Sequence, residues 1–197
     1  MSALFSIHPL HFMATELLRT PIVEVRWCQL LGSARSNKFD PTKNPTWEVE
    51  IILENDNPEH VAWCESIEAQ FEELHKGEKK HTHWLPIKAD KEQPKTRQSC
   101  RFKLPEFTYK DGNKSEGPVV YDAQGNHWPA EKLIGNGSKM RIGFDIYGWK
   151  APTGAGMTLQ PKGAQVIEWI AAPMTKPSSA ADFGFEVAPA TESKIPF

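Results

Sequence analysis

The stretch Lys139-Met-Arg-Ile-Gly-Phe-Asp-Ile-Tyr-Gly-Trp-Lys150 indicates the fold more clearly than any other part of the sequence. Its even positions from Met140 to Ile146 are apolar, whereas its odd positions are mostly charged or aromatic. Successive side chains of a β-strand point to opposite faces, so this alternation predicts a strand with one face in a hydrophobic core.

The same alternation recurs on both sides of this strand. Trp27 and Trp47 each alternate with polar neighbours, and both are therefore predicted to lie in the core. Pro161 and Gly163 indicate a bulge or bend within the last strand. The expected strands are 23–32, 47–53, 100–107, 119–121, 139–149 and 157–170.

One segment follows a helical period instead. Asn57 is a favourable N-cap, Pro58 suits the first helical position, and Gly77 is a plausible end. Apolar residues recur every three or four positions at Val61, Cys64, Ile67, Phe71 and Leu74. The polar segments 33–45 and 79–98 are predicted to be loops. Together these elements favour a small, mainly β barrel or sandwich with one inserted helix.

The outward face of the 139–150 strand carries unusual side chains. Lys139, Arg141, Tyr147 and Trp149 would face solvent, where strands more often carry Thr, Ser, Glu or Lys. Aromatic rings can stack on bases, while cations neutralise phosphates regardless of sequence, so this face predicts single-stranded nucleic-acid binding. Alternatively, Tyr147 and Trp149 cover a small cluster beneath the tail or a loop.

Cations lie beside aromatic residues in several other elements, as expected of a groove that follows a nucleic-acid backbone. The formal charge of the whole chain is −2, so any binding surface must concentrate its positive charge on one face. We expect the rim of this groove to include Arg35, Lys38, Phe39, Lys103, Tyr109 and Lys150.

Motifs of catalysis are missing from the sequence. No nucleophile elbow, phosphate-binding glycine loop, paired-carboxylate site or H-E-x-x-H motif occurs, so we predict a protein that is not an enzyme and needs no cofactor. His81 and His83, with His75 and Cys100, lack the spacing of a zinc site. The widely spaced Cys28, Cys64 and Cys100 predict reduced thiols in a cytoplasmic protein. Residues 1–20 predict neither a signal peptide nor a membrane span.

The last residues have a separate character. Residues 173–197 show no periodic pattern and are predicted to form a flexible tail after a domain at 1–172, with an N-terminal arm at 1–20. The tail ends in Ile195-Pro196-Phe197. A terminal aromatic ring with a free carboxylate can fill a basic-rimmed pocket of a partner protein.

The order of elements, the helix after the second strand and the stretch Ile134-Gly-Asn-Gly-Ser-Lys-Met140 before the alternating strand together resemble the single-stranded DNA-binding proteins of short-tailed bacteriophages. The similarity spans roughly residues 20–172 and extends to the terminal Phe. Ile195-Pro196-Phe197 also resembles the terminal tripeptide of bacterial single-stranded DNA-binding proteins.

This resemblance implies an OB-fold, a five- to six-stranded Greek-key barrel, that protects single strands in the host cytoplasm during replication, recombination and repair. It implies that the C-terminal aromatic residue contacts the replicative DNA polymerase, the helicase-primase or host tail-binding proteins, and that a homodimer is possible. The tail departs from the family because its net charge is only −1. Competition of the tail with DNA should therefore be weak, and dimerisation through tail exchange is in doubt.

The sequence thus predicts a sequence-independent single-stranded DNA-binding protein with no membrane association. Three alternatives remain open: an all-β phage structural or protein-interaction module whose aromatic residues form an interface, an RNA-binding OB domain, and a carbohydrate-binding β domain.

Overall fold

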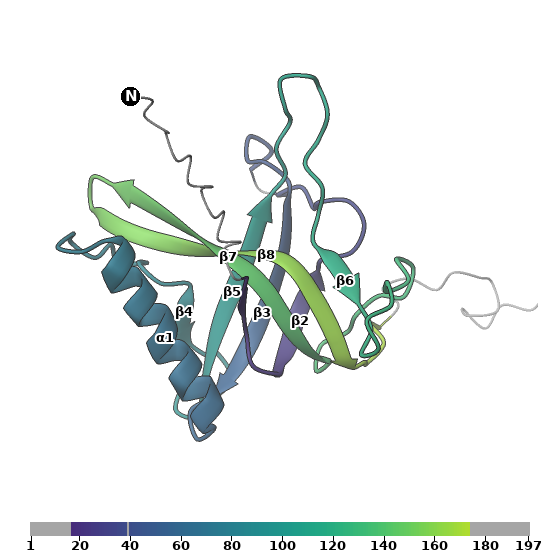
Figure 1. The fold of residues 1–197 in the computed structure, drawn as a ribbon, viewed down its shortest axis with the longest axis horizontal. Helices are drawn as coiled ribbons and strands as arrows, with labels where there is room; N and C mark the ends of the chain where they lie inside the picture. The colour runs from purple at the N-terminus through teal and green to yellow at the C-terminus, as the bar shows by residue number, and fades with distance from the viewer. Residues whose placement is uncertain (1–16, 39, 174–197) are drawn as a thin grey trace, which may run out of the picture.

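The computed structural model describes residues 17–38 and 40–173 (Figure 1). Five strands pair in a closed ring, in which β7 pairs with β2, β2 with β3, β3 with β5, β5 with β8, and β8 with β7. These strands are β2 (Val23–Gln29), β3 (Thr46–Glu54), β5 (Arg97–Pro105), β7 (Lys139–Ala151) and β8 (Gly154–Glu168). Only β5 and β8 run parallel within the ring. The predicted mainly β barrel is confirmed.

Three short strands add to this barrel at its edges. They are β1 (Leu18–Arg19) against β7, β4 (Ile87–Ala89) against β5, and β6 (Val119–Tyr121) against β8. The prediction of an uninterrupted loop over 79–98 was wrong, since β4 lies within it. Strands of two or three residues are too short to show a period, and pairing with an existing strand fixes them.

The core fills the barrel interior as the alternation of β7 predicts. Met140, Ile142 and Phe144 are fully buried, and Ile146 is half-buried. On β8 the predicted bulge is confirmed, because Gly143 pairs with Gly163 whereas Phe144 pairs with Pro161, which leaves Lys162 as the extra residue. The bulge shifts the inward positions of β8 from odd to even numbers, so that both halves of a long, curved strand can face the core.

Trp27 corrects the predicted core. Trp47 is buried as expected, but Trp27 is 62% exposed and has a φ of 53°. The pairing of β2 with β3 slips between Arg26 and Gln29, which turns the indole of Trp27 away from the core. The backbone N–H of Trp27 donates to Asn136 Oδ1 at 2.9 Å. A bulge of this kind leaves the polar–apolar pattern intact while reversing the direction of one side chain.

Helix α1 (Pro58–Leu74) begins where predicted. Asn57 caps it by accepting hydrogen bonds from the backbone N–H groups of Glu59 and His60. Its buried face carries Trp63, whose ring meets Phe144 edge-on with centroids 6.0 Å apart. In Figure 1 the helix lies along one side of the barrel, beside β4.

The β7–β8 hairpin projects past the barrel and is held by the chain that follows α1. Ala155 N–H donates to the carbonyl of Lys79, and His81 N–H donates to the carbonyl of Ala155. Met157 N–H donates to the carbonyl of Trp84. In Figure 1 the hairpin reaches toward the helix side of the molecule. The hairpin and the segment 79–84 therefore form one wall, and this wall positions Trp149.

The three cysteines lie in the core or pack against it. Cys64 and Cys100 are buried, Cys28 is half-buried, and all three are free thiols. Burial raises the pKa of Cys28 and of Cys64 to about 11. Most of the predicted arm at 1–20 and nearly all of the tail at 173–197 lie outside the described residues. Within the described ranges, no helix is long and apolar enough to cross a membrane.

Candidate nucleic-acid interface

The outer face of β5 carries two cations, opposite carboxylates of β3. Phe102 is fully buried, so its neighbours Arg101 and Lys103 point away from the core. Phe102 pairs with Leu159 across the parallel β5–β8 contact, which places Thr158 and Gln160 beside these two cations. The local alternation of β5 thus directs both cations to one surface.

Two cavities meet on Arg101 and Lys103, and both residues line each of them. One cavity, of about 400 Å³, extends under the 33–45 loop. The other, of about 530 Å³, extends toward the β7–β8 hairpin. We call the continuous depression the β5 groove. Its other lining residues include Arg35, Lys38, Lys43, Thr46, Glu48, Glu68, His83, Trp84, Lys88, Gln98, Trp149, Met157 and Thr158.

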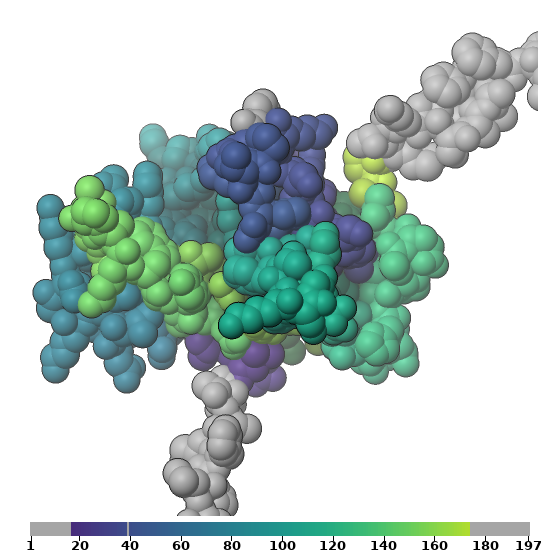
Figure 2. Space-filling view, turned by 90° about the horizontal axis from the view of Figure 1, so that it is seen from above, coloured from purple at the N-terminus to yellow at the C-terminus, as the bar shows by residue number. Residues whose placement is uncertain are grey.

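The surroundings of the groove are visible from above the barrel. Figure 2 shows the loop after β2 (blue) beside the long loop after β5 (teal), with the β7–β8 hairpin (green) farther along the same face. In a five-stranded OB barrel, oligonucleotides bind the face of the second and third strands. This face lies between the loop that joins strands one and two and the loop that joins strands four and five. Here β3 and β5 are the second and third strands of the closed ring, so the β5 groove occupies the corresponding position.

Glutamates of β3 pair with the groove cations. Glu50 lies directly opposite Arg101, whose Nη2 donates to Glu50 Oε2 at 3.0 Å. Glu48 lies opposite Lys103, with 3.8 Å between Lys103 Nζ and Glu48 Oε2. Both cations keep about half of their side-chain surface exposed. A phosphate entering the groove would therefore exchange with carboxylates that hold the cations in place.

The loop cations are less compensated. Lys43 pairs with Asp40 at 3.2 Å, and the pKa of Asp40 is lowered first by a hydrogen bond from Thr42 and then by Lys43. Arg35 and Lys38 have no carboxylate within ion-pair distance among residues 17–38 and 40–173. Phe39, predicted to lie at this rim, is outside the described residues.

Trp149 reaches the groove from the hairpin and is half-buried. Its ring meets His81 edge-on with centroids 5.2 Å apart, and it packs over Gly156, its partner on β8. Trp84 lies in the same cavity, with the ammonium of Lys80 3.9 Å from its ring centroid. The predicted alternative, in which the aromatic residues cover a local cluster, thus describes part of the surface of Trp149 but not Tyr147, which is 57% exposed.

The other residues predicted from the 139–150 strand do not all lie on one surface. Tyr147 and Lys150 lie on opposite faces of β7 near the hairpin, whereas Lys139 and Arg141 lie at its other end. Tyr147 pairs with Thr158, a groove residue, and so stands at the groove rim. Lys150 is directed elsewhere, because its Nζ lies 2.6 Å from Glu78 Oε1 near the end of α1. That contact, through its hydrogen bond first and its charge second, lowers the pKa of Glu78.

Lys139 and Arg141 lie at the far end of β7. Lys139 Nζ is 2.9 Å from Glu168 Oε2, and Arg141 lines a separate cavity with Arg19 and Tyr121. The structure therefore does not bring these two cations into the groove with Trp149. A single alternating strand of this length passes more than one surface region as it curves around a barrel.

Tyr109 lies on the long loop that follows β5 and is 58% exposed. It lines a neighbouring cavity of about 490 Å³ together with Phe107, Lys114, Gln160 and Lys162. Because Gln160 flanks the groove, this cavity continues the outer surface of β8 beyond Thr158. Tyr109 is thus adjacent to the groove without lining it.

Arg101 and Trp84 are among the groove residues that sequence reasoning did not select as binding residues. For Arg101 the signal was available, because the alternation around the apolar Phe102 directs Arg101 and Lys103 to the same face. Trp84 gave no periodic signal, because it lies in an irregular segment between α1 and β4. Its position depends on hydrogen bonds to the β7–β8 hairpin, which only the folded chain reveals.

The histidines considered as metal ligands have other surroundings. The rings of His81 and His83 have centroids 5.8 Å apart, and His75 Nε2 lies 3.0 Å from the carbonyl oxygen of Gly156. Among the described residues, no group of three or more His, Cys, Asp or Glu side chains is arranged to hold a metal ion.

Solved structures of phage proteins share the fold of this chain. No protein-family model and no curated protein sequence matches this chain. The structure of gp2.5, a single-stranded DNA-binding protein encoded by bacteriophage T7, superposes with a TM-score of 0.61 at 18% identity, covering 85% of this chain and 99% of that one. This chain therefore shares the fold of that protein along most of its length.

Two structures of the single-stranded DNA-binding protein of bacteriophage Enc34 share this fold. The protein in complex with single-stranded DNA has a TM-score of 0.61 at 14% identity, covering 78% of this chain and 87% of that one. A C-terminally truncated form has a TM-score of 0.57 at 13% identity, covering 79% and 87%. At these identities the likeness concerns the fold, and the residues of the groove must be judged on their own chemistry.

Proposed function

We propose that this protein binds single-stranded DNA in the β5 groove, independently of base sequence and without catalysing a reaction. The observation that carries the proposal is the meeting of two cavities on Arg101 and Lys103, with cations of the 33–45 loop at one end and Trp149 at the other. A line of cations with aromatic residues along it is the arrangement that follows a flexible sugar–phosphate backbone while bases stack.

The proposed contacts divide the work between two kinds of side chain. Arg35, Lys38 and Lys103 neutralise phosphates, which supplies affinity without sequence preference. Trp149 and Tyr147 offer ring surface for stacking, worth about 1–3 kcal/mol per base. The phage proteins that share the fold, one of them solved with single-stranded DNA, support the proposal.

A fluorescence titration tests this function directly. The full-length protein would be titrated with oligo-dT at low and moderate salt, with duplex DNA and oligo-rU as controls, while tryptophan emission is followed. We expect strong quenching by the single strand, weaker binding at higher salt, and little response to duplex. Absence of quenching by folded protein at low salt would reject the proposal, and preference for oligo-rU would reassign the groove to RNA.

We also propose that the C-terminal Ile195-Pro196-Phe197 recruits replication or recombination proteins while the barrel holds DNA. These residues lie outside the described part of the chain, and the proposal rests on the chemistry of a terminal aromatic residue with a free carboxylate. Deletion of Phe197 should leave DNA affinity unchanged and abolish co-purification of a replicative polymerase or helicase-primase. Equal recovery of partners by both forms would contradict it.

A further inference from the structure

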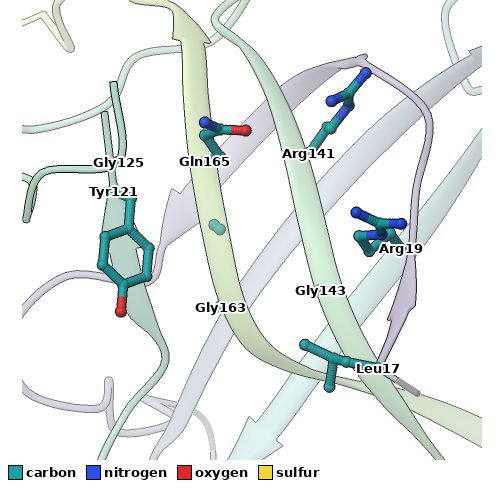
Figure 3. Close-up of a pocket in the computed structure, with 9 residues that line it drawn as sticks. Leu17, Arg19, Tyr121, Gly125, Arg141, Gly143, Gly163 and Gln165 are labelled. Carbon is teal, nitrogen blue, oxygen red and sulfur yellow. The ribbon is translucent and has the colours of Figure 1, made fainter. Parts of the chain in front are cut away.

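The cavity that Arg141 lines with Arg19 and Tyr121, of about 400 Å³, lies on the outer surface of the barrel at the end of β7 remote from Trp149 (Figure 3). Strands β1, β7, β8 and β6 cross it side by side, and cross-strand pairs join Arg19 to Gly143, Gly143 to Gly163, and Arg141 to Gln165. The cavity floor is consequently made by two glycines that face each other. We call it the two-glycine pocket.

The walls of the two-glycine pocket differ in character. Figure 3 shows Arg19 and Arg141 on one side of the glycine floor and Tyr121 on the other. The Tyr121 ring packs against His127 with centroids 5.0 Å apart, which fixes its orientation. Gln165 donates to the carbonyl oxygens of Asp122 and Ala123 at 3.4 and 3.3 Å and closes one end. The Leu17 side chain lies over Gly143, so the open part of the floor is at Gly163, between the two guanidinium groups and the phenol.

The two arginines differ from the other cations of the barrel strands. Arg26, Arg97, Arg101, Lys103, Lys139, Lys150 and Lys162 each have a carboxylate within 4.0 Å. No described carboxylate comes that close to Arg19 or Arg141, and no acidic residue lines the pocket. Two guanidinium groups that have no acidic partner among residues 17–38 and 40–173, beside a concave surface, indicate an anionic ligand, and phosphate matches guanidinium geometry well.

The glycine floor indicates a flat group beside that anion. Glycine within a strand weakens it and often marks a bulge or a place where a ligand approaches the backbone. Gly163 follows the bulge at Lys162 but has an ordinary φ, and a Cβ there would meet only the carbonyl oxygen of Val119 at 3.4 Å. Gly163 is therefore not required by crowding within the fold, and its missing side chain leaves the floor open.

The outer surface of β8 connects this pocket to the β5 groove. Thr158 lines the groove, Gln160 and Lys162 line the cavity that contains Tyr109, and Gly163 and Gln165 line the two-glycine pocket. The five steps along the chain from Thr158 to Gly163 span roughly 17 Å at the rise of a β-strand. Cavities therefore follow one another along a single strand, at a separation that a few nucleotides can bridge.

We infer that the two-glycine pocket is an additional nucleotide site for single-stranded DNA that leaves the β5 groove. Arg19 and Arg141 bind a backbone phosphate, and the adjoining base lies over Gly163, between Leu17 and Tyr121. This inference rests on the proposed function of the groove. It extends the bound length of DNA along β8 and gives Arg141 a role separate from that of Trp149.

Binding of two DNA lengths tests the inference. Oligo-dT of about 8 and about 30 nucleotides, short and long relative to the usual span of one OB barrel, would be titrated against wild type and Arg19→Gln/Arg141→Gln. We expect the double variant to bind the long strand about tenfold more weakly and the short strand normally. Its slope of log K against log salt for the long strand should fall by about 0.7 per lost phosphate contact.

Two further variants separate the pocket from general charge and from misfolding. Lys91→Gln/Lys95→Gln removes the same charge from exposed lysines that line neither the groove nor the pocket, and long-strand affinity should be nearly unchanged. Gly163→Ala keeps both arginines but fills the floor, and it should weaken only the long strand. Oligonucleotides carrying 5-iodouracil should crosslink to Tyr121 when long and not when short.

The outcomes separate failure of the groove function from failure of the additional site. If wild type fails to bind even the short strand, the function proposed for the groove is rejected. If the short strand binds but the double variant and Gly163→Ala both bind the long strand as wild type does, the additional site is rejected. Circular dichroism and thermal melting of each variant establish that its barrel is folded before binding is compared.

Discussion

Glu50 and Arg101 face each other across β3 and β5, with Arg101 Nη2 3.0 Å from Glu50 Oε2. The next pair outward along the same strands is Glu48 with Lys103, and a third, Glu54 with Arg97, lies at the other end. The proposed DNA-binding face is thus built as a ladder of ion pairs. This arrangement orders the cations before DNA arrives but opposes the approach of phosphate.

Removing a carboxylate from this ladder should therefore strengthen DNA binding. Glu48→Gln leaves the shape of the groove intact while freeing Lys103, and we expect affinity for oligo-dT at low salt to rise about two- to fivefold, since an exposed pair is worth up to about 1 kcal/mol. Titration at several salt concentrations measures this effect.

Glu54→Gln is the matched control for that experiment. It breaks a pair of the same kind on the same two strands, with 2.8 Å between Arg97 Nε and Glu54 Oε1, but neither residue lines the groove. Affinity should stay near the wild-type value. An equal gain in both variants would mean that overall charge, rather than the release of Lys103, controls binding.

Trp149 is expected to provide most of the fluorescence response. Trp149→Ala should lower affinity for oligo-dT about tenfold, in line with about 1–3 kcal/mol per stacked base, and should remove most of the quenching. Trp27→Phe serves as the control, because Trp27 is exposed but does not line the groove. Loss of quenching in Trp27→Phe instead would place the DNA on a different surface.

The alternation of β7 was sufficient to predict a strand whose apolar side chains point into the core while Trp149 lies on its outer face. It could not show that Lys139 and Arg141 lie in a different surface region from Trp149. Alternation specifies the face of a strand but not how that face curves around the barrel. Trp27 was misjudged because a bulge reverses a side chain without altering the pattern. The groove itself required knowledge of which strands pair, and Trp84 required the contacts between distant segments.

The contact between Trp149 and Gly156 predicts a stability effect. A Cβ on Gly156 would clash with the indole ring, so Gly156→Ala should destabilise the protein by about 1–3 kcal/mol and displace Trp149. Urea unfolding measures the first effect and DNA titration the second.

The double variant Trp149→Ala/Gly156→Ala shows whether the clash is the cause. Removal of the ring should restore much of the stability lost in Gly156→Ala, which is a coupling that a double-mutant cycle reports directly. Additive losses in the double variant would point to a backbone effect of alanine at position 156 and not to contact with Trp149.

Asp90 predicts how stability depends on pH. Its buried carboxylate accepts hydrogen bonds from the backbone N–H groups of Glu92 and Gln93 and from Arg26 at 3.0 Å. Burial alone would raise the pKa of Asp90, but these hydrogen bonds and the charge of Arg26 outweigh it and lower the pKa. The charged carboxylate therefore stabilises the fold above the unfolded-state pKa of about 3.9, and this contribution is lost as pH falls through the folded-state value.

Asp90→Asn should consequently cost about 1–3 kcal/mol at pH 7, because it removes the most buried of the three carboxylates that pair with Arg26 and leaves only Glu24 and the exposed Glu92. The difference from wild type should persist down to about pH 5 and shrink below about pH 4, where the wild-type carboxylate also becomes neutral. Urea unfolding at a series of pH values measures it. Asp145→Asn breaks the exposed pair with Lys162 and should change stability by less than about 1 kcal/mol. A pH-independent loss in Asp90→Asn would show that packing at position 90, and not its charge, stabilises the barrel.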